Sequence, residues 1–112
     1  MAEYSRILVA RGGAIGDFVL TMPVFSALKE TYPEASIGCL SPSGYGELVA
    51  SVELANAWKN LDDRVWASFF VSNGDLDDEM AKWVSQFDLI VSFLYDREEA
   101  WVNNIRRICS AR

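Results

Sequence analysis

The chain has no histidine among its 112 residues, and this absence removes several kinds of chemistry. Ser-His-Asp catalysis, Cys-His catalysis and zinc sites with histidine ligands are all excluded. Proton transfer near neutral pH must then use a carboxylate, a cysteine, or a lysine or tyrosine with a shifted pKa. The two cysteines, Cys39 and Cys109, lie far apart, and Cys39 belongs to an apolar run. We therefore expect a buried Cys39, no disulfide framework and a reducing, cytoplasmic compartment.

Positive charge and long apolar runs are also scarce. Ten Lys and Arg residues stand against 16 Asp and Glu residues, which gives a net charge of -6. Because no basic stripe is present to neutralise phosphates, we expect no nucleic-acid partner. No apolar run approaches the roughly 18 residues that span a bilayer, and the N-terminus does not resemble a signal peptide. Peripheral contact with a membrane surface stays open, and the length predicts a single domain over residues 1–112.

The most informative segment is a glycine-rich turn that follows an apolar run. Residues 6–28 read RILVARGGAIGDFVLTMPVFSAL. The unbroken apolar run at residues 7–10 predicts a strand that is covered on both faces, as in parallel sheets. Gly12, Gly13 and Gly16 then permit a tight turn and close approach of the backbone.

A helix is predicted directly after this turn, from residue 17 onward. Its apolar residues recur every three or four positions and would form one buried face: Phe18, Met22, Phe25, Leu28 and Tyr32. Pro23 should kink this helix near Thr21 or restart it there, and Pro33 should end it.

Strands and helices are predicted to alternate along the rest of the chain. We expect strands at residues 35–40, 64–71 and 88–95, and helices at residues 45–52, 75–87 and 98–108. Asp75 is the expected N-cap of the second of these helices. The alternation predicts an α/β fold, a Rossmann-like three-layer domain with a mainly parallel sheet. Ligands bind such sheets at the carboxyl ends of the strands, here residues 11–17, 41–45, 72–75 and 95–98.

The glycine turn does not match two common phosphate-binding patterns. A dinucleotide-binding G-x-G-x-x-G would need glycine in place of Arg11, and a P-loop would need lysine in place of Asp17. The unpaired amides at the start of a helix nevertheless favour phosphate or developing negative charge. On spacing alone, Asp17 is either a helix-start residue or a catalytic group, and both interpretations remain open.

A wider set of residues carries a family resemblance. The sequence RGGAIGD at residues 11–17 is followed by Thr21, Met22 and Pro23, then by YPEA at residues 32–35 and FDLIV at residues 87–91. This combination resembles the family 9 glycosyltransferases, the heptosyltransferases of lipopolysaccharide synthesis. The resemblance implies that the chain corresponds to the N-terminal, acceptor-side half of a GT-B glycosyltransferase with two Rossmann-like domains.

The resemblance also implies a reaction. A sugar would be transferred with inversion from a nucleotide-sugar such as ADP-heptose to a lipopolysaccharide or other glycan acceptor, with no metal and no cofactor. Asp17 would accept the proton of the attacking hydroxyl as general base. The donor diphosphate would face the backbone of four consecutive residues of the turn: Gly13, Ala14, Ile15 and Gly16.

Four further residues are candidates for binding substrate: Arg11, Thr21, Asp96 and Arg97. Arg11 would bind an anionic group or pair with a neighbouring carboxylate, and these two roles remain equal. Asp96 and Arg97 would contact the acceptor or form a salt bridge within their own loop.

The chain ends at Arg112, so the donor-binding domain that the family resemblance implies is not in this sequence. We expect a fragment or one half of a split protein, which binds acceptor weakly and does not turn over alone. An apolar flank near Trp101 should then be exposed and permit a homodimer. Two other functions stay open: a stand-alone phosphate- or nucleotide-binding module, and a non-catalytic interaction domain.

Overall fold

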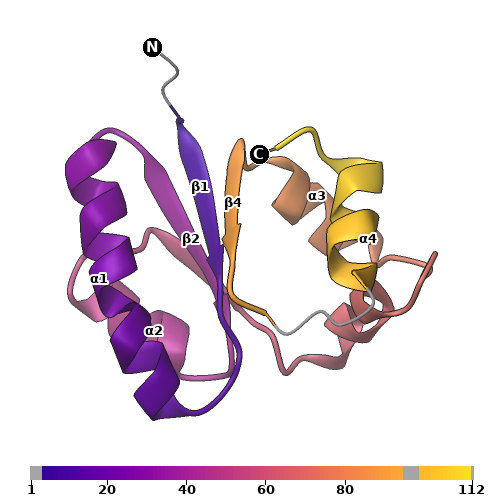
Figure 1. The fold of residues 1–112 in the computed structure, drawn as a ribbon, viewed down its shortest axis with the longest axis horizontal. Helices are drawn as coiled ribbons and strands as arrows, with labels where there is room; N and C mark the ends of the chain where they lie inside the picture. The colour runs from indigo at the N-terminus through magenta and orange to yellow at the C-terminus, as the bar shows by residue number, and fades with distance from the viewer. Residues whose placement is uncertain (1–3, 95–98, 112) are drawn as a thin grey trace.

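A computed structural model describes residues 4–94 and 99–111. Four strands form one sheet in the order β3-β2-β1-β4, and every neighbouring pair is parallel (Figure 1). The strands are β1 (Arg6–Ala10), β2 (Ser36–Ser41), β3 (Ala57–Asn60) and β4 (Leu89–Ser92). The predicted α/β fold with a mainly parallel sheet is confirmed.

Helices cover both faces of this sheet and complete three layers (Figure 1). One face carries α1 (Ile15–Thr31) and α2 (Tyr45–Ser51). The other face carries the 3₁₀ helix η1 (Arg64–Phe70), α3 (Asp78–Ser85) and α4 (Ala100–Ile108). Strand β1 lies between β2 and β4, which explains why residues 7–10 are fully buried. Within residues 4–94 and 99–111, no helix combines the length and apolarity that crossing a bilayer requires.

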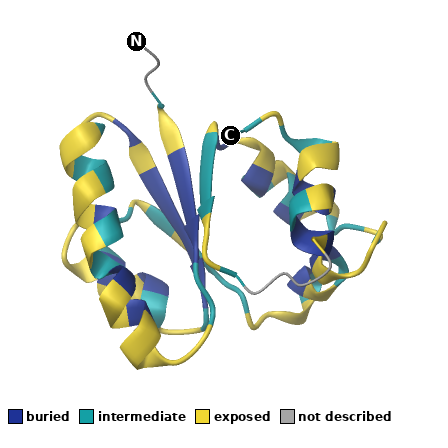
Figure 2. Ribbon diagram, in the orientation of Figure 1, coloured by how far each residue is buried: buried dark blue, intermediate teal, exposed yellow. Residues whose placement is uncertain are grey.

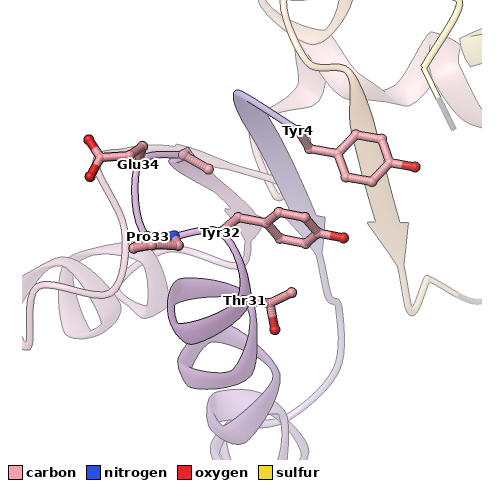
Figure 3. A pocket seen from close by; sticks show the side chains of 6 residues that line it. Tyr4, Thr31, Tyr32, Pro33 and Glu34 are labelled. Carbon is pink, nitrogen blue, oxygen red and sulfur yellow. The ribbon is translucent and has the colours of Figure 1, made fainter. Parts of the chain in front are cut away.

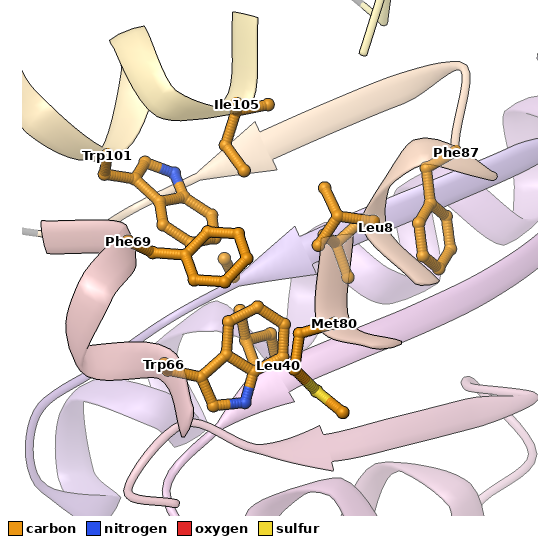
Figure 4. Close-up of a cluster of buried hydrophobic side chains, with 10 residues drawn as sticks. Leu8, Leu40, Trp66, Phe69, Met80, Phe87, Trp101 and Ile105 are labelled. Atoms are coloured by element: carbon orange, nitrogen blue, oxygen red, sulfur yellow. The ribbon is translucent and has the colours of Figure 1, made fainter. Parts of the chain in front are cut away.

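The sheet separates two groups of buried side chains. On the side of α3 and α4 lies an aromatic cluster (Figure 4), which comprises Leu8, Ala10, Leu40, Trp66, Phe69, Met80, Val84, Phe87, Trp101 and Ile105. On the opposite side lies an α1 cluster, which comprises Val9, Phe18, Phe25, Ile37, Cys39 and Val49. Cys39 is buried as predicted, and this burial raises the pKa of its thiol above the ordinary value.

The third strand was predicted in the wrong place. The predicted strand of residues 64–71 is the 3₁₀ helix η1 up to Phe70, and the strand is β3, in a segment where no strand was predicted. The side chain of Asp63 caps η1 by accepting a hydrogen bond from the N–H of Val65 at 3.2 Å. Side chains three residues apart align on a 3₁₀ helix, so Trp66 and Phe69 both enter the aromatic cluster.

Two predicted helix boundaries also differ. The predicted helix of residues 75–87 is shorter as α3, and its N-cap is Asp77, whose side chain accepts from the N–H of Met80 at 3.1 Å. The first predicted helix begins earlier, at Ile15, and continues through Pro23, so the predicted restart does not occur. Asp17 consequently lies inside the first turn of α1.

The flank near Trp101 was expected to be exposed, but Trp101 itself is buried. Trp101 is only 1% exposed, because it packs against Phe69 and Phe70 with ring centroids 5.9 and 5.4 Å apart. A cavity of about 270 Å³ between β4 and α4 is what remains open on that side. The homodimer through this flank stays a prediction.

Candidate functional site

The glycine turn starts directly at the carboxyl edge of the sheet. The N–H of Arg11 donates to the carbonyl of Leu40 at 2.9 Å, and the N–H of Leu61 donates to the carbonyl of Ser41 at 2.7 Å. These two bonds extend the strand pairing by one residue beyond β1 and β3. The loops after β1 and β3 therefore lie on either side of the end of β2, where ligands of parallel sheets bind.

The start of α1 offers free backbone donors. Its N-cap, Ala14, makes no side-chain capping bond, and the N–H of Phe18 donates to the carbonyl of Ala14 at 3.1 Å. The amides of Ile15, Gly16 and Asp17 therefore have no acceptor within the helix. These donors and the positive end of the helix dipole converge at one place, which favours an anion.

Gly13 and Gly16 of this turn meet different constraints. Gly13 has a φ of 87°, in the left-handed region, and a Cβ there would lie 3.2 Å from the Oδ2 of Asp17. The shape of the turn therefore requires Gly13. A Cβ on Gly16 would meet no atom within 4 Å, so packing within the described residues does not require a glycine there. The missing side chain leaves space beside the free amides.

The carboxylate of Asp17 is accessible. Its side chain is 58% exposed, and its Oδ1 lies 3.9 Å from an Nη of Arg11. This separation is too long for a hydrogen bond. Among residues 4–94 and 99–111, no hydrogen-bond donor contacts the carboxylate of Asp17, so an incoming group could bond it.

Arg11 and Asn60 place unsatisfied polar atoms at the same edge of the sheet. The guanidinium of Arg11 lies 5.7 Å from the ring centroid of Phe93. Within the part of the chain that the structure describes, the buried Nε of Arg11 and the buried Oδ1 of Asn60 have no hydrogen-bond partner. Buried polar atoms without partners are uncommon, so these two atoms mark this edge as a candidate binding surface; Asn60 also lines the cavity of about 240 Å³ beside Trp66. The prediction missed Asn60 because it did not place a strand at residues 57–60.

Two contacts hold the neighbouring loops in place. Ser43 donates to the carboxylate of Asp62 through its hydroxyl at 2.8 Å and its N–H at 3.1 Å. The hydroxyl bond, followed by the backbone bond, lowers the pKa of Asp62 below its ordinary value. The hydroxyl of Tyr45 donates to the carbonyl of Gly13 at 3.4 Å, and its ring lies 4.9 Å from that of Phe18. These contacts support the glycine turn from the side of α2.

Thr21, another predicted substrate-binding residue, is not brought to this surface. Thr21 is 5% exposed, and its hydroxyl donates to the carbonyl of Asp17 at 3.1 Å, so it lies beneath the site. Asp96 and Arg97 lie outside the described residues. The predicted strand end at residues 72–75 lies against α4 instead, where Arg107 donates to the carbonyl of Gly74 at 2.7 Å.

The surface around Asp17 is open. A cavity of about 100 Å³ lies at the opposite end of the sheet, between Tyr4 and Tyr32 (Figure 3). Further cavities of about 180, 240 and 270 Å³ are lined by other residues than Asp17. Each is smaller than the roughly 300 Å³ at which pockets for small ligands begin. The glycine turn would become part of a cleft only when a second surface faces it.

The fold and the position of the glycine turn define a Rossmann-like α/β domain with its candidate site at the carboxyl ends of the strands. A similar fold is found in the crystal structure of the glycosyl transferase family 9 protein from Veillonella parvula DSM 2008, with a TM-score of 0.64 and 16% sequence identity. The similarity covers 92% of this chain and 30% of that chain. The sequence matches no family model and no curated protein. The similarity therefore shows a common fold.

Proposed function

We propose that this domain is the acceptor-side domain of an inverting glycosyltransferase of the heptosyltransferase type. The observation that carries the proposal is the exposed carboxylate of Asp17, which lies next to unpaired amides at the start of α1. A proton acceptor and an anion-binding backbone are the two groups that such a transfer needs at one place. The resemblance of residues 11–17 to the opening of family 9 and the shared fold both support this assignment.

In the proposed reaction, Asp17 accepts the proton of the acceptor hydroxyl while that oxygen attacks the anomeric carbon of a nucleotide-sugar such as ADP-heptose. The new bond forms on the face opposite the leaving group, and the bond from the anomeric carbon to the diphosphate oxygen breaks. The nucleoside diphosphate leaves with both electrons of that bond. The backbone amides of the turn face the negative charge that grows on this leaving group, and as fixed donors they stabilise the transition state. These amides belong to Gly13, Ala14, Ile15 and Gly16.

Arg11 has a proposed binding role beside this carboxylate. Its ion pair with Asp17 is long and partly exposed, and such pairs contribute about 0–1 kcal/mol. The guanidinium therefore loses little interaction energy when it leaves Asp17 and binds an anionic group of the donor or acceptor. Within the described residues the Nε of Arg11 has no hydrogen-bond partner, which supports this role, since a ligand oxygen would satisfy that donor.

A second domain is part of the proposal, because the site is open and transfer needs both substrates held together. The chain spans 30% of the family 9 structure that it resembles. We assign the activity to a complete protein in which a donor-binding domain faces the glycine turn. The proposed acceptor is a lipopolysaccharide or other glycan at the cytoplasmic face of a membrane.

The test is Asp17→Asn in the complete protein that contains this domain. Loss of the base should lower the transfer rate by about 10²–10⁴-fold, measured as release of nucleoside diphosphate from ADP-heptose. The matched control is Asp78→Asn, because Asp78 is also an exposed acidic residue in the first turn of a helix. Both substitutions remove a favourable interaction with a helix dipole, about 0.3–1 kcal/mol, but only Asp17→Asn should affect transfer.

An unchanged rate in Asp17→Asn would reject Asp17 as the base. If the isolated 112-residue chain bound ADP while the complete protein catalysed no transfer, the stand-alone nucleotide-binding module would be the better assignment.

A further inference from the structure

The outward side of α1 is exposed and apolar. Leu20 is 79% exposed, Val19 is 51% exposed and Ile15 is 49% exposed. Figure 2 shows exposed residues along the outer side of this helix, away from the sheet. No charged residue occurs between Asp17 and Lys29. A surface helix of a globular protein ordinarily carries charged or polar residues on its outer face. The outer side of α1 is therefore suited to contact with another apolar surface.

Most of the exposed residues of α1 form a continuous stripe that we call the α1 face. Its central residues follow one another every three or four positions, as neighbours on one side of a helix do. Several of them are small, so another helix can approach closely. The α1 face consists of Gly16, Val19, Leu20, Pro23, Ser26, Ala27 and Glu30.

The two ends of the α1 face are electrostatically complementary. Glu30 is the single charged member of the face and lies in the last turn of the helix. The first turn presents the uncapped amides near Gly16, which attract negative charge. Asp17, the other exposed acid of α1, is directed to Arg11 and lies outside the face.

We propose that two copies of this chain pair through the α1 face, with their helices antiparallel around a twofold axis at Pro23. Gly16 and Glu30 are equally far from Pro23 in sequence, so the axis places Glu30 of each copy at the first turn of the other helix. The same surface serves both copies, as in other twofold dimers. Leu20 and Val19 of each copy are covered in the pair.

The size of the face indicates a weak dimer. A helix of 17 residues is about 25 Å long, and one helix from each copy buries less than the roughly 800 Å² per partner of a standard interface. An anionic membrane is a poorer occupant, because the face carries no lysine or arginine and the chain has a net charge of -6.

This inference does not rest on the proposed transferase function. In the pair, Glu30 of one copy lies at the start of α1 of the other copy. The proposed function places a donor diphosphate at the same helix start, so pairing and diphosphate binding would exclude one another. The experiment is therefore run without nucleotide, and its result bears on the pairing alone.

The first test is sedimentation velocity of the 112-residue chain over a range of concentrations. We expect a monomer–dimer equilibrium. Leu20→Glu, which places a charge in the centre of the contact, and Glu30→Lys, which reverses a charge, should each raise the dimer dissociation constant by about tenfold or more. Val71→Glu is the matched control, because Val71 is 59% exposed but lies after η1, on the other side of the sheet. It should leave the dimer unchanged.

The second test is cross-linking in a Cys109→Ser background, in which the remaining cysteine, Cys39, is buried. Pro23→Cys should give a covalent dimer with a short bis-maleimide, because the axis places the two substituted positions opposite each other. Val71→Cys should stay monomeric. A monomeric wild type at the highest concentration, equal dissociation by Val71→Glu, or no cross-link through Pro23→Cys would each overturn the proposal. Binding of neutral lipid vesicles by a chain that stays monomeric would overturn it as well.

Discussion

Gly13 and Gly16 lie three positions apart in the same turn, yet the structure separates their roles. Gly13 adopts a left-handed backbone, and a Cβ there would lie 3.2 Å from the Oδ2 of Asp17, so the fold itself requires glycine. Gly16 has free space where a side chain would lie. A glycine that the fold does not need, beside free amides, leaves room for a ligand.

We predict that Gly16→Ala stabilises the domain and impairs ligand binding. Alanine inside a helix is favoured over glycine by about 0.5–1 kcal/mol, but its methyl group would stand where a diphosphate approaches. Gly13→Ala should instead destabilise by about 1–2 kcal/mol, because alanine disfavours the left-handed region. Urea unfolding and calorimetric titration of the complete protein with ADP measure the two effects. A Gly16→Ala variant that is more stable and binds ADP normally would show that the turn holds no diphosphate.

The 3₁₀ helix η1 is held by a side chain from elsewhere in the chain. Asn104 of α4 is 1% exposed, and its Nδ2 donates to the carbonyls of Phe69 and Val71, both at 2.9 Å. Its Oδ1 accepts from Arg107 at 2.8 Å. This amide therefore bonds carbonyls at the end of η1, where the carbonyl of Val71 also accepts from the N–H of Gly74 at 2.9 Å.

We predict that Asn104→Ala destabilises the domain by about 1–3 kcal/mol, because it removes the donor of the buried carbonyl of Phe69. Asn103→Ala is the matched control, since Asn103 is the preceding residue of the same helix and is exposed, and it should change stability by less than about 0.5 kcal/mol. Chemical denaturation followed by circular dichroism gives both values. Equal effects of the two substitutions would show that the bonds from Asn104 do not hold η1.

Across the domain, the aromatic cluster unites the largest number of elements. Trp66 is 1% exposed, and its ring centroid lies 4.9 Å from Phe69, 6.2 Å from Trp83 and 6.4 Å from Trp101. These four residues come from η1, α3 and α4. One side chain thus joins every helix on that side of the sheet.

We predict that Trp66→Ala costs about 3–5 kcal/mol, a large part of the roughly 5–15 kcal/mol that holds such a domain folded. Trp58→Ala is the control, because Trp58 is 40% exposed on the edge strand β3. This substitution should lower the free energy of unfolding by clearly less. The free energies of unfolding in urea compare the two variants. Similar losses would mean that the aromatic cluster is not the main support of the fold.

The first half of the fold was predictable because its signals are local. The strand at residues 7–10, the glycine turn and the apolar stripe of α1 each depend on neighbours within a few residues. The burial of Thr21 was also visible in principle, since Thr21 stands three residues after Phe18 and four before Phe25 on the buried face. Strand β3 was missed because its four residues, three partly buried and one exposed at a sheet edge, leave no clear alternation.

The sequence alone determined the α/β class, the order of most elements and the position of Asp17 beside free amides, because periodicity and glycine act over short stretches of chain. Only the tertiary structure decided which loops meet around that carboxylate, as shown by the contact of Tyr45 with Gly13 across 32 positions. It also decided that, within the described residues, Arg11 and Asn60 each keep one buried polar atom without a hydrogen-bond partner, and that α1 turns an apolar face outward. Packing between distant segments sets these features, and no short pattern in the chain records it.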